Sequence, residues 1–347
     1  MQAFISYLPG FILSLAVAAV SKLIGSIHVG VNPIDAYIGT SVIALFIGMI
    51  INHFHKPDKQ LAPGIRFTSK KVLKLAIILL GASMSMGTIL KVGAQSLEVM
   101  VFTLLTCFGG GYFIGKALGL NWKLSNLISA GTGICGGSAI AAIAPVIDAD
   151  DSDVAYALSA TFLFDMAMIV LFPLMGHAMG LSDNAYGLWA GTAVNDTSSV
   201  VAAGYAFSEA AGDFATMVKL TRTLSIIPTV IVFTLIQMNL KRKEALAAGG
   251  TAEAKANIRF TKLFPWFILG FLAIAAVKSL GLIPDGVSAV LKDVSKFLMV
   301  AALAAIGMNT SFRDMAKSGI RPMLHGFIIS ALVVVVAITV EWFMGLV

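Results

Sequence analysis

The chain has 347 residues, of which 58% are hydrophobic and 12% are charged, and its formal net charge is +6. Soluble domains carry about 25% charged residues, so this composition excludes an ordinary soluble domain and favours a protein that crosses a membrane. Two cysteines and five histidines without ligand spacing form neither a disulfide framework nor a metal site. No metal and no cofactor are therefore expected, apart from a coupling ion such as Na⁺ or H⁺.

Apolar runs of about 20 residues, the length that crosses a bilayer, divide the chain into eleven expected helical spans. The prediction is an all-α polytopic membrane protein that forms one transmembrane domain over residues 1–347. The spans are expected at about residues 4–26, 36–53, 72–90, 97–118, 124–147, 154–179, 184–205, 214–240, 263–281, 289–310 and 322–345.

The loops differ in charge. Basic residues cluster in loops 53–74 and 241–262 and near residues 313–321, whereas the turn at 148–153 is acidic. Because cytoplasmic loops are enriched in Lys and Arg, the N-terminus is expected in the cytoplasm and the C-terminus in the periplasm. With eleven spans, the acidic turn then lies outside. The Ala/Gly-rich loop 241–262 is expected to be a cytoplasmic linker between two halves.

An internal repeat relates residues 36–118 to residues 262–345. At an offset of 226, for example, Ser69 and Gly81 fall on Ser295 and Gly307. Matching elements are seven spans apart, so they would cross the membrane in opposite directions. Such an inverted repeat is a common scaffold of secondary transporters.

A second internal similarity appears when the sequence is aligned with itself at an offset of 60 residues, which aligns Gly131 and Thr132 with Gly191 and Thr192. These segments lie two spans apart and would run parallel if both crossed completely. Either one of them is re-entrant, or the first break pairs with the tenth span near residues 307–311. The pattern leaves both possibilities open.

The first polar break, GTGICGGS at residues 131–138, lies in the middle of the fifth span. Free backbone groups are costly in hydrocarbon, so a break persists there only where it lines a protein cavity or a hydrated site. Close packing of small residues is the alternative. The residues expected to offer N–H groups or side chains to a substrate are Thr132, Gly133, Cys135, Gly136, Gly137 and Ser138.

The second break, in the seventh span, contributes Asn195, Asp196, Thr197 and Ser198 to the expected substrate site. A carboxylate at this depth is a functional hypothesis by default, so Asp196 is expected to bind substrate, Na⁺ or a proton. The alternative is that Asp196 caps the N-terminus of a half-helix.

Lys219 and Arg222 are spaced i and i+3 on the eighth span, so they share one helix face. Arg222 is expected to bind a substrate anion, because a guanidinium group can donate two hydrogen bonds to one oxyanion. A structural ion pair with Asp196 or Asp165 is the alternative. Asp165, Asn309 and Thr310 join Asp196 as expected ion-coupling residues.

The chain resembles the YeiH-type family of sulfate exporters. The resemblance covers nearly the whole chain and is carried mainly by GTGICGGSAIAAIAPVI from Gly131, GLWAGTAVNDTSSVVAAG from Gly187 and AAIGMNTSF from Ala304. That family is grouped with the cation:proton antiporter and bile-acid:sodium symporter superfamily. The resemblance implies crossed discontinuous helices, a core domain that moves against a panel domain, and a homodimer.

The function expected from these observations is secondary active transport. The chain would move a small anion, sulfate or sulfonate-like, across the bacterial inner membrane by alternating access. The alternative is a Na⁺- or H⁺-coupled symporter or antiporter of an organic solute. No enzyme is expected, since no histidine in the motif spans could activate Ser138 or Cys135. The expected partners are the anion and membrane lipid, with no nucleic acid.

Overall fold

The computed structural model describes residues 6–29, 32–33, 39–247, 265–310 and 319–347. Helices make up nearly all of these residues, and a two-residue antiparallel bridge, β1 (His28–Val29) with β2 (Asn32–Pro33), adds the only strands among them. The helices are α2 (Leu8–Gly25), α4 (Thr40–Phe54), α5 (Ala62–Phe67), η1 (Thr68–Val72), α6 (Leu73–Leu80), η2 (Gly81–Ser83), α7 (Met86–Leu105), η3 (Thr106–Gly110), α8 (Gly111–Ala117), α9 (Trp122–Ala130), η4 (Gly131–Cys135), α10 (Gly137–Ile143), α11 (Asp151–Ala178), α12 (Asp183–Ala193), α13 (Thr197–Phe207), α14 (Glu209–Leu224), α15 (Ile226–Ala247), α17 (Trp266–Ser279), α18 (Asp285–Asn309) and α20 (Ile320–Phe343).

Five helices are long and apolar enough to cross a membrane: Leu8–Gly25, Met86–Ala117, Asp151–Ala178, Glu209–Lys243 and Ile320–Phe343. Between a quarter and a half of each apolar window is buried inside the molecule, so large apolar side chains remain on the outside. An apolar exterior of this extent is typical of a helical bundle surrounded by lipid.

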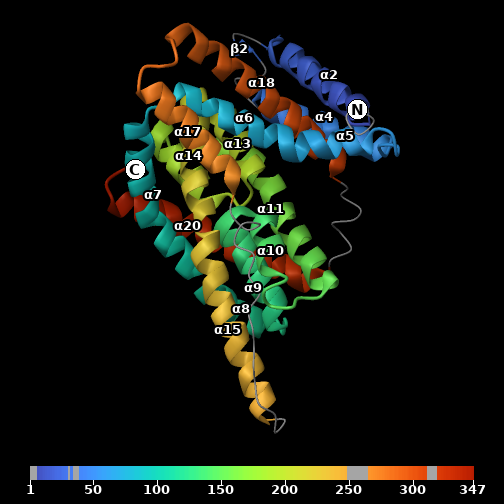
Figure 1. The fold of residues 1–347 in the computed structure, drawn as a ribbon, viewed down its shortest axis with the longest axis vertical. Helices are drawn as coiled ribbons and strands as arrows, with labels where there is room; N and C mark the ends of the chain where they lie inside the picture. The colour runs from blue at the N-terminus through green and yellow to red at the C-terminus, as the bar shows by residue number, and fades with distance from the viewer. Residues whose placement is uncertain (1–5, 30–31, 34–38, 248–264, 311–318) are drawn as a thin grey trace.

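The helices form two bundles. The first contains α2, α4, α5, α6, α17 and α18, and Figure 1 shows most of these helices side by side in its upper part. Glycines allow its helices to approach closely: a Cβ on Gly307 of α18 would lie 2.1 Å from the Leu45 carbonyl of α4, and one on Gly10 would lie 2.2 Å from the Leu61 carbonyl. Small residues at such crossings let backbones touch, so dispersion contacts hold these helices together.

The second bundle contains α7 to α15 together with α20, and Figure 1 shows much of it below the first, with α15 extending farthest. The helix α20 packs one face against α7, α9, α11 and α12, and its opposite face is exposed. The buried core of the second bundle includes Phe164, Phe172, Tyr186 and Trp189, and the Phe172 ring meets Tyr186 edge to face and Trp189 at a tilt.

Charged side chains join the two bundles at one seam. Lys292 Nζ on α18 lies 2.8 Å from both Glu209 Oε1 and Asp213 Oδ2 on α14, and Lys296 also pairs with Glu209. Tyr205 donates a 2.5 Å hydrogen bond to the other oxygen of Asp213. Lys292, Lys296 and Glu209 are partly exposed, and we call these four charged residues the α14–α18 seam.

The segment expected to cross as residues 124–147 does not cross. It forms a re-entrant hairpin, in which α9 and η4 enter the bundle and α10 returns beside α9. Lys123, at the start of α9, donates to the carbonyl of Asp148, and Asn121 donates to the carboxylate of Asp153 at 3.1 Å. Both ends of the segment therefore lie at the same end of the molecule, and we call residues 122–147 hairpin 1.

The segment expected as residues 184–205 is also a hairpin. It is made of α12 and α13, and its two ends are joined because Ser208 donates a 2.5 Å hydrogen bond to Asp183. The 28-residue helix α11 separates the start of hairpin 2 (residues 183–207) from the end of hairpin 1. The two hairpins therefore enter the bundle from opposite ends, which answers the question raised by the offset of 60: both segments are re-entrant.

The hairpins change the expected position of the acidic turn. Asp148 forms a 2.6 Å ion pair with Lys241 and accepts a hydrogen bond from Gln237, both on α15. The hydrogen bond from Lys241 is the main cause of a lowered pKa of Asp148, and the hydrogen bond from Gln237 lowers this pKa further. The expectation that the acidic turn and the basic segment from Lys241 lie on opposite sides is wrong, because it counted hairpin 1 as a full crossing.

The expected third and fourth spans are divided differently as well. A continuous helix runs from Ala62 to Ser83, so the second half of the loop expected at 53–74 is helical. The next helix begins at Met86 and includes residues 91–96, which were expected to form a loop. Ser96 is buried there, so tertiary packing overrides the local polarity of this stretch. Most of the linker 241–262, as well as Arg313 and Lys317, lies outside the described residues.

Candidate functional site at the hairpin tips

The tip of hairpin 1 is a sharp reversal at Gly136. The preceding turn, η4, is a π-helix closed by a 2.9 Å hydrogen bond from the Gly136 N–H to the Gly131 carbonyl, and α10 begins at Gly137. Gly136 has φ 63° and ψ −133°. This conformation is open to glycine and strained for residues that carry a Cβ. Glycine at this position therefore allows the chain to turn back inside the bundle.

The tip of hairpin 2 is an extended stretch from Val194 to Asp196 between α12 and α13. Asp196 has φ −89° and ψ 148°, and its carboxylate accepts hydrogen bonds from the backbone N–H (2.9 Å) and the hydroxyl of Ser198. It is therefore the N-cap of α13. This capping role does not exclude ligand binding, since Asp196 is only partly buried.

The two tips touch each other. A Cβ on Gly136 would lie 2.8 Å from Asp196 Oδ1 and 3.1 Å from Asp196 Cα. This contact places the unwound backbone of one hairpin directly against the unwound backbone of the other. The sequence motifs at 131–138 and 191–199 thus meet in space, as their polarity suggested.

Gly136→Ala should damage this contact. The new methyl group would occupy a positive-φ position and press on Asp196, so we expect a loss of about 1–2 kcal/mol of stability from the backbone conformation alone. Thermal unfolding of the purified protein in detergent, followed by tryptophan fluorescence, measures the loss. Gly180→Ala is the control, because Gly180 also has a positive φ but no other atom lies within 4 Å of the position that its Cβ would take. An equal loss in both variants would show that the contact between the tips contributes nothing.

Arg222 and Lys219 of α14 bind the carbonyl groups of both tips. Arg222 donates from Nε to Gly133 O (2.7 Å), from Nη2 to Thr132 O (2.5 Å) and from Nη1 to Val194 O (3.2 Å). Both side chains are buried. Lys219 Nζ donates to Val194 O (3.0 Å) and to Ile134 O (2.9 Å). The carbonyls at the ends of α12 and of α9–η4 have no partners in their own helices, and they carry partial negative charge. The two cations therefore join the hairpins and offset that charge.

Asp165 of α11 binds the backbone of hairpin 2 from the other side. It is fully buried, and its two oxygens accept from the backbone N–H groups of Asn195 (3.0 Å) and Asp196 (2.9 Å). In the described structure neither Arg222 nor Lys219 forms an ion pair with Asp165 or Asp196. The expected alternative of a direct ion pair is therefore absent there, and backbone groups lie between the opposite charges.

Ser330 of α20 was not predicted from the sequence. Its Oγ accepts from Asn195 Nδ2 (3.3 Å) and lies 3.4 Å from Thr132 Oγ1, so it contacts both tips. Asn195 Oδ1 is buried without a hydrogen-bond partner in the described structure. Ser330 is one serine within a long apolar run, and no local pattern distinguishes it from a serine that bonds its own helix.

The predicted residues differ in their accessibility. Thr132, Gly133, Cys135 and Asn195 are buried, whereas Ser138 is exposed and Gly137 and Thr197 are intermediate. Asn309 and Thr310, in contrast, lie at the end of α18, where they bond Ser69 and the Ile306 carbonyl. The structure places these last two residues in the first bundle and does not bring them to the tips.

Opposed hairpins, apolar outer helices and buried charges at the tips define a polytopic helical membrane protein. Comparison with known proteins agrees with this class. The family described as Conserved hypothetical protein 698 matches residues 9–326, and the chain belongs to that family. A UPF0324 membrane protein of Clostridium tetani is 57% identical over 311 residues, which cover 89% of this chain and 90% of that protein.

Two streptococcal relatives span almost the full chain. A UPF0324 membrane protein of Streptococcus agalactiae is 38% identical over 347 residues, covering 97% of this chain and 98% of its own. Another, of Streptococcus pyogenes, is 37% identical over 354 residues and covers 100% of both chains. These names identify membrane proteins and mention no substrate.

Proposed function

We propose that the protein is a secondary active transporter that moves a small anion, such as sulfate or a sulfonate, by alternating access. The observation that carries the proposal is the contact between two re-entrant hairpins that enter from opposite ends. Discontinuous helices near the bilayer midplane are how many secondary transporters form a substrate site. Unwound backbone at that depth is tolerated where protein or a hydrated cavity surrounds it.

The directions of the hairpins and of two helices in the first bundle support the proposal of alternating access. Residues of hairpin 1 align with residues of hairpin 2 at a sequence offset of 60, and the two hairpins enter the bundle from opposite ends. In the first bundle, Ser295 donates to the Ala76 carbonyl and Ser288 to the Ala82 carbonyl, so α6 and α18 run antiparallel. The sequences of α6 and of part of α18 align with each other at the offset of 226 residues. We propose that these relations reflect an inverted repeat, because such a repeat gives a transporter two exchangeable conformations, one open to each side.

The charges at the tips support an anionic substrate. Arg222 uses three nitrogens for the tip carbonyls, and an arginine has five N–H donors. Ser138 and Thr197, at the starts of the returning half-helices, keep accessible hydroxyl groups. We propose that an anion binds there, beside the first turn of α13, where backbone N–H groups favour negative charge.

A coupled carrier of an organic solute is the second candidate. It is favoured by Asn195 Oδ1, which is buried without a hydrogen-bond partner in the described structure, while Nδ2 of the same amide donates to Ser330 Oγ. Oxygen atoms of this kind are the ligands that Na⁺ and other hard cations take. Asp196→Asn should abolish Na⁺ or H⁺ dependence if this candidate is right, and it should leave anion binding intact if the cations of α14 dominate.

The decisive experiment combines binding and transport. Thermal shifts of the purified protein are measured with sulfate, sulfite, sulfonates, carboxylates and Na⁺. The protein is then reconstituted into liposomes that contain sulfate, and the uptake of labelled sulfate by exchange is measured. Saturable exchange together with stabilisation by sulfate is expected. Stabilisation only by Na⁺ with an uncharged solute would reject the anion, and uptake that does not saturate would indicate a channel.

We also propose that the chain lies in the bacterial inner membrane with its N-terminus in the cytoplasm and its C-terminus in the periplasm. The basic loop around residues 55–61 and the segment from Lys241 then both face the cytoplasm. With two hairpins the acidic turn at 148–153 moves to the same side. Cysteine placed at Asp148 or Lys241 should be labelled by a membrane-impermeant maleimide only from the cytoplasmic side, and cysteine at Asp183 only from the periplasm. Both native cysteines are buried, so they add little background. Labelling of positions 148 and 183 from the same side would reject this arrangement.

A further inference from the structure

The helix α20 carries most of the unpaired polar atoms in the buried part of the described structure. Five such side-chain atoms have no hydrogen-bond partner there: Asn195 Oδ1, Gln237 Oε1, His325 Nδ1, Glu341 Oε1 and Glu341 Oε2. Three of them belong to α20, and Asn195 bonds α20 through Ser330. Buried polar groups are nearly always paired, so such a concentration on one helix requires an explanation.

Glu341 is the most unusual of these groups. Its side chain is completely buried, and neither carboxyl oxygen has a partner in the described structure. It is also the only acidic residue of α20. An isolated carboxylate pays a large desolvation cost in an apolar site, and binding a proton removes the charge. Ionisable groups inside a membrane domain mark ion pathways and proton relays.

The described surroundings of Glu341 contain no partner for its charge. The titratable side chains on the described helices packed against α20 are Lys91, Glu98, Cys107, Tyr112, Lys116, Lys123, Cys135, Asp151, Asp153, Tyr156, Asp165, His177, Asp183 and Tyr186. None of them forms a hydrogen bond or an ion pair with Glu341. The carboxyl group is thus set apart from the ion pairs of the described structure, and protonation is the simplest way to neutralise it.

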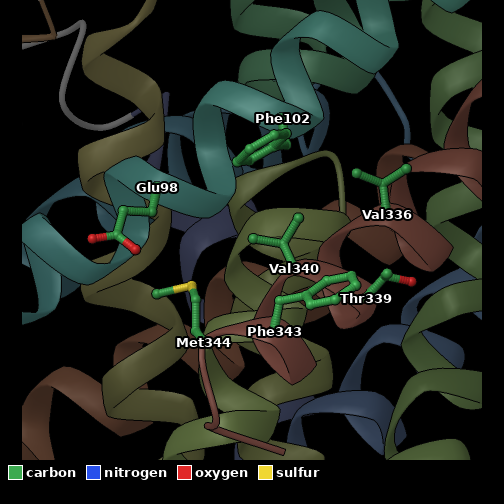
Figure 2. Close-up of a pocket in the computed structure, with 7 residues that line it drawn as sticks. All are labelled: Glu98, Phe102, Val336, Thr339, Val340, Phe343 and Met344. Carbon is green, nitrogen blue, oxygen red and sulfur yellow. The ribbon is translucent and has the colours of Figure 1, made fainter.

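Glu341 lies near the C-terminal end of α20, next to a groove on the outside of the bundle. Glu341 is two residues from the end of α20, and the chain then folds back so that Leu346 N–H bonds the Glu341 carbonyl. On the adjacent face of the same turn, Val340 and Met344 line a groove of about 420 Å³ together with Glu98. Figure 2 shows the Glu98 carboxylate and the Met344 side chain on facing sides of this groove.

The same helix connects Glu341 to the hairpin tips. Ser330, which contacts both tips, lies eleven residues earlier, or about 16 Å along the helix at 1.5 Å per residue. Residues Ser330, Val333, Ala337 and Glu341 follow a spacing of three to four and are all buried, so they share one face of α20. Glu341 and Ser330 therefore lie on one face of the same helix, which links the buried carboxyl group to the contact with the hairpin tips.

We propose that Glu341 is a proton-binding site that couples proton movement to the transport cycle. This inference rests on the proposed function as a transporter. A proton from the aqueous phase at the C-terminal end of α20 adds to a carboxylate oxygen of Glu341, forming an O–H bond, and it is released when the packing around α20 changes. The coupled species is thus a proton, and its site lies outside the hairpin tips.

Glu341→Gln tests the proposal, because glutamine keeps the shape and cannot ionise. Infrared spectra of the purified protein should contain the C=O stretching band of a protonated carboxylic acid that is lost in E341Q and kept in the control Glu98→Gln. In liposomes, an imposed pH gradient should stimulate sulfate uptake by the wild type and by E98Q. E341Q should lose this stimulation and retain sulfate exchange at equal pH, and Glu341→Asp should recover part of the stimulation.

The possible outcomes separate the two proposals. A carboxylic-acid band that is unchanged in E341Q, or stimulation of E341Q equal to that of the wild type, would overturn the assignment of Glu341. If the band depends on Glu341 and the wild type shows no sulfate exchange, the proton site stands and sulfate transport fails. If E341Q does not fold, a band present in E98Q and E341D and stimulation retained by both still support the site, whereas no band in either variant would overturn it.

Discussion

Replacing Arg222 by methionine is expected to cause the largest loss of stability of any single substitution at the hairpin tips. The change leaves the carbonyls of Thr132 and Gly133 without their guanidinium donors, while Val194 keeps its bond to Lys219. Each buried polar group left unpaired costs about 1–3 kcal/mol, so we expect a loss of about 2–6 kcal/mol for the two carbonyls. Methionine fills much of the volume of the arginine stem, so the loss reports mainly on the hydrogen bonds.

The measurement is the midpoint of thermal unfolding in detergent, together with the yield of monodisperse protein. The control is Arg321→Met, which makes the same replacement at an exposed position of α20 and should change the midpoint little. A small effect of Arg222→Met, similar to that of the control, would mean that the tips are held together without this side chain. Retained stability with lost sulfate binding would instead assign Arg222 to the substrate.

Asp165→Asn should have the second largest effect. The carboxylate accepts two backbone N–H groups of hairpin 2, whereas an asparagine oxygen can face only one of them and its NH₂ group would face the other. One N–H group is left without an acceptor and the charge that offsets Lys219 is lost, so a cost of about 3 kcal/mol is expected. Transport should fall as well, because the tip of hairpin 2 loses its fixed position.

Equilibrium unfolding and sulfate exchange are measured for the same samples. Asp151→Asn is the matched control, since it lies in the first turn of the same helix and is exposed. If Asp165→Asn keeps wild-type stability and loses only its dependence on Na⁺ or pH, Asp165 serves a coupling ion rather than the backbone.

The sequence predicted the polar breaks that form the tips, because glycines and a carboxylate inside apolar runs have few structural explanations. It did not reveal that both segments turn back. Hydropathy measures how apolar a stretch of about 20 residues is, and a segment that returns has the same apolar content as one that crosses. The reversal depends on one positive φ at Gly136, and the neighbouring Gly131, Gly133 and Gly137 have no positive φ.

The cations illustrate a second limit. The spacing of Lys219 and Arg222 predicted a shared helix face, and both do donate to the Val194 carbonyl. Their main partners are carbonyl oxygens, which every residue carries, so the sequence contains no signal for them. Ser330 and Glu341 were overlooked for a related reason, since the significance of each depends on what surrounds it in the folded bundle.

The α14–α18 seam has a mechanical consequence. At Gly10 and Gly307 the helix backbones of the first bundle touch, and we expect these contacts to resist sliding of its helices past one another. The seam, in contrast, consists of lysine and carboxylate side chains, of which only Glu209 is largely exposed, and exposed ion pairs contribute only about 0–1 kcal/mol each. Lys292 and Lys296 are one helical turn apart, so a shift of α18 by one turn would bring the second lysine to the carboxylates that the first one binds, and we expect these ion pairs to survive such a shift by exchanging partners.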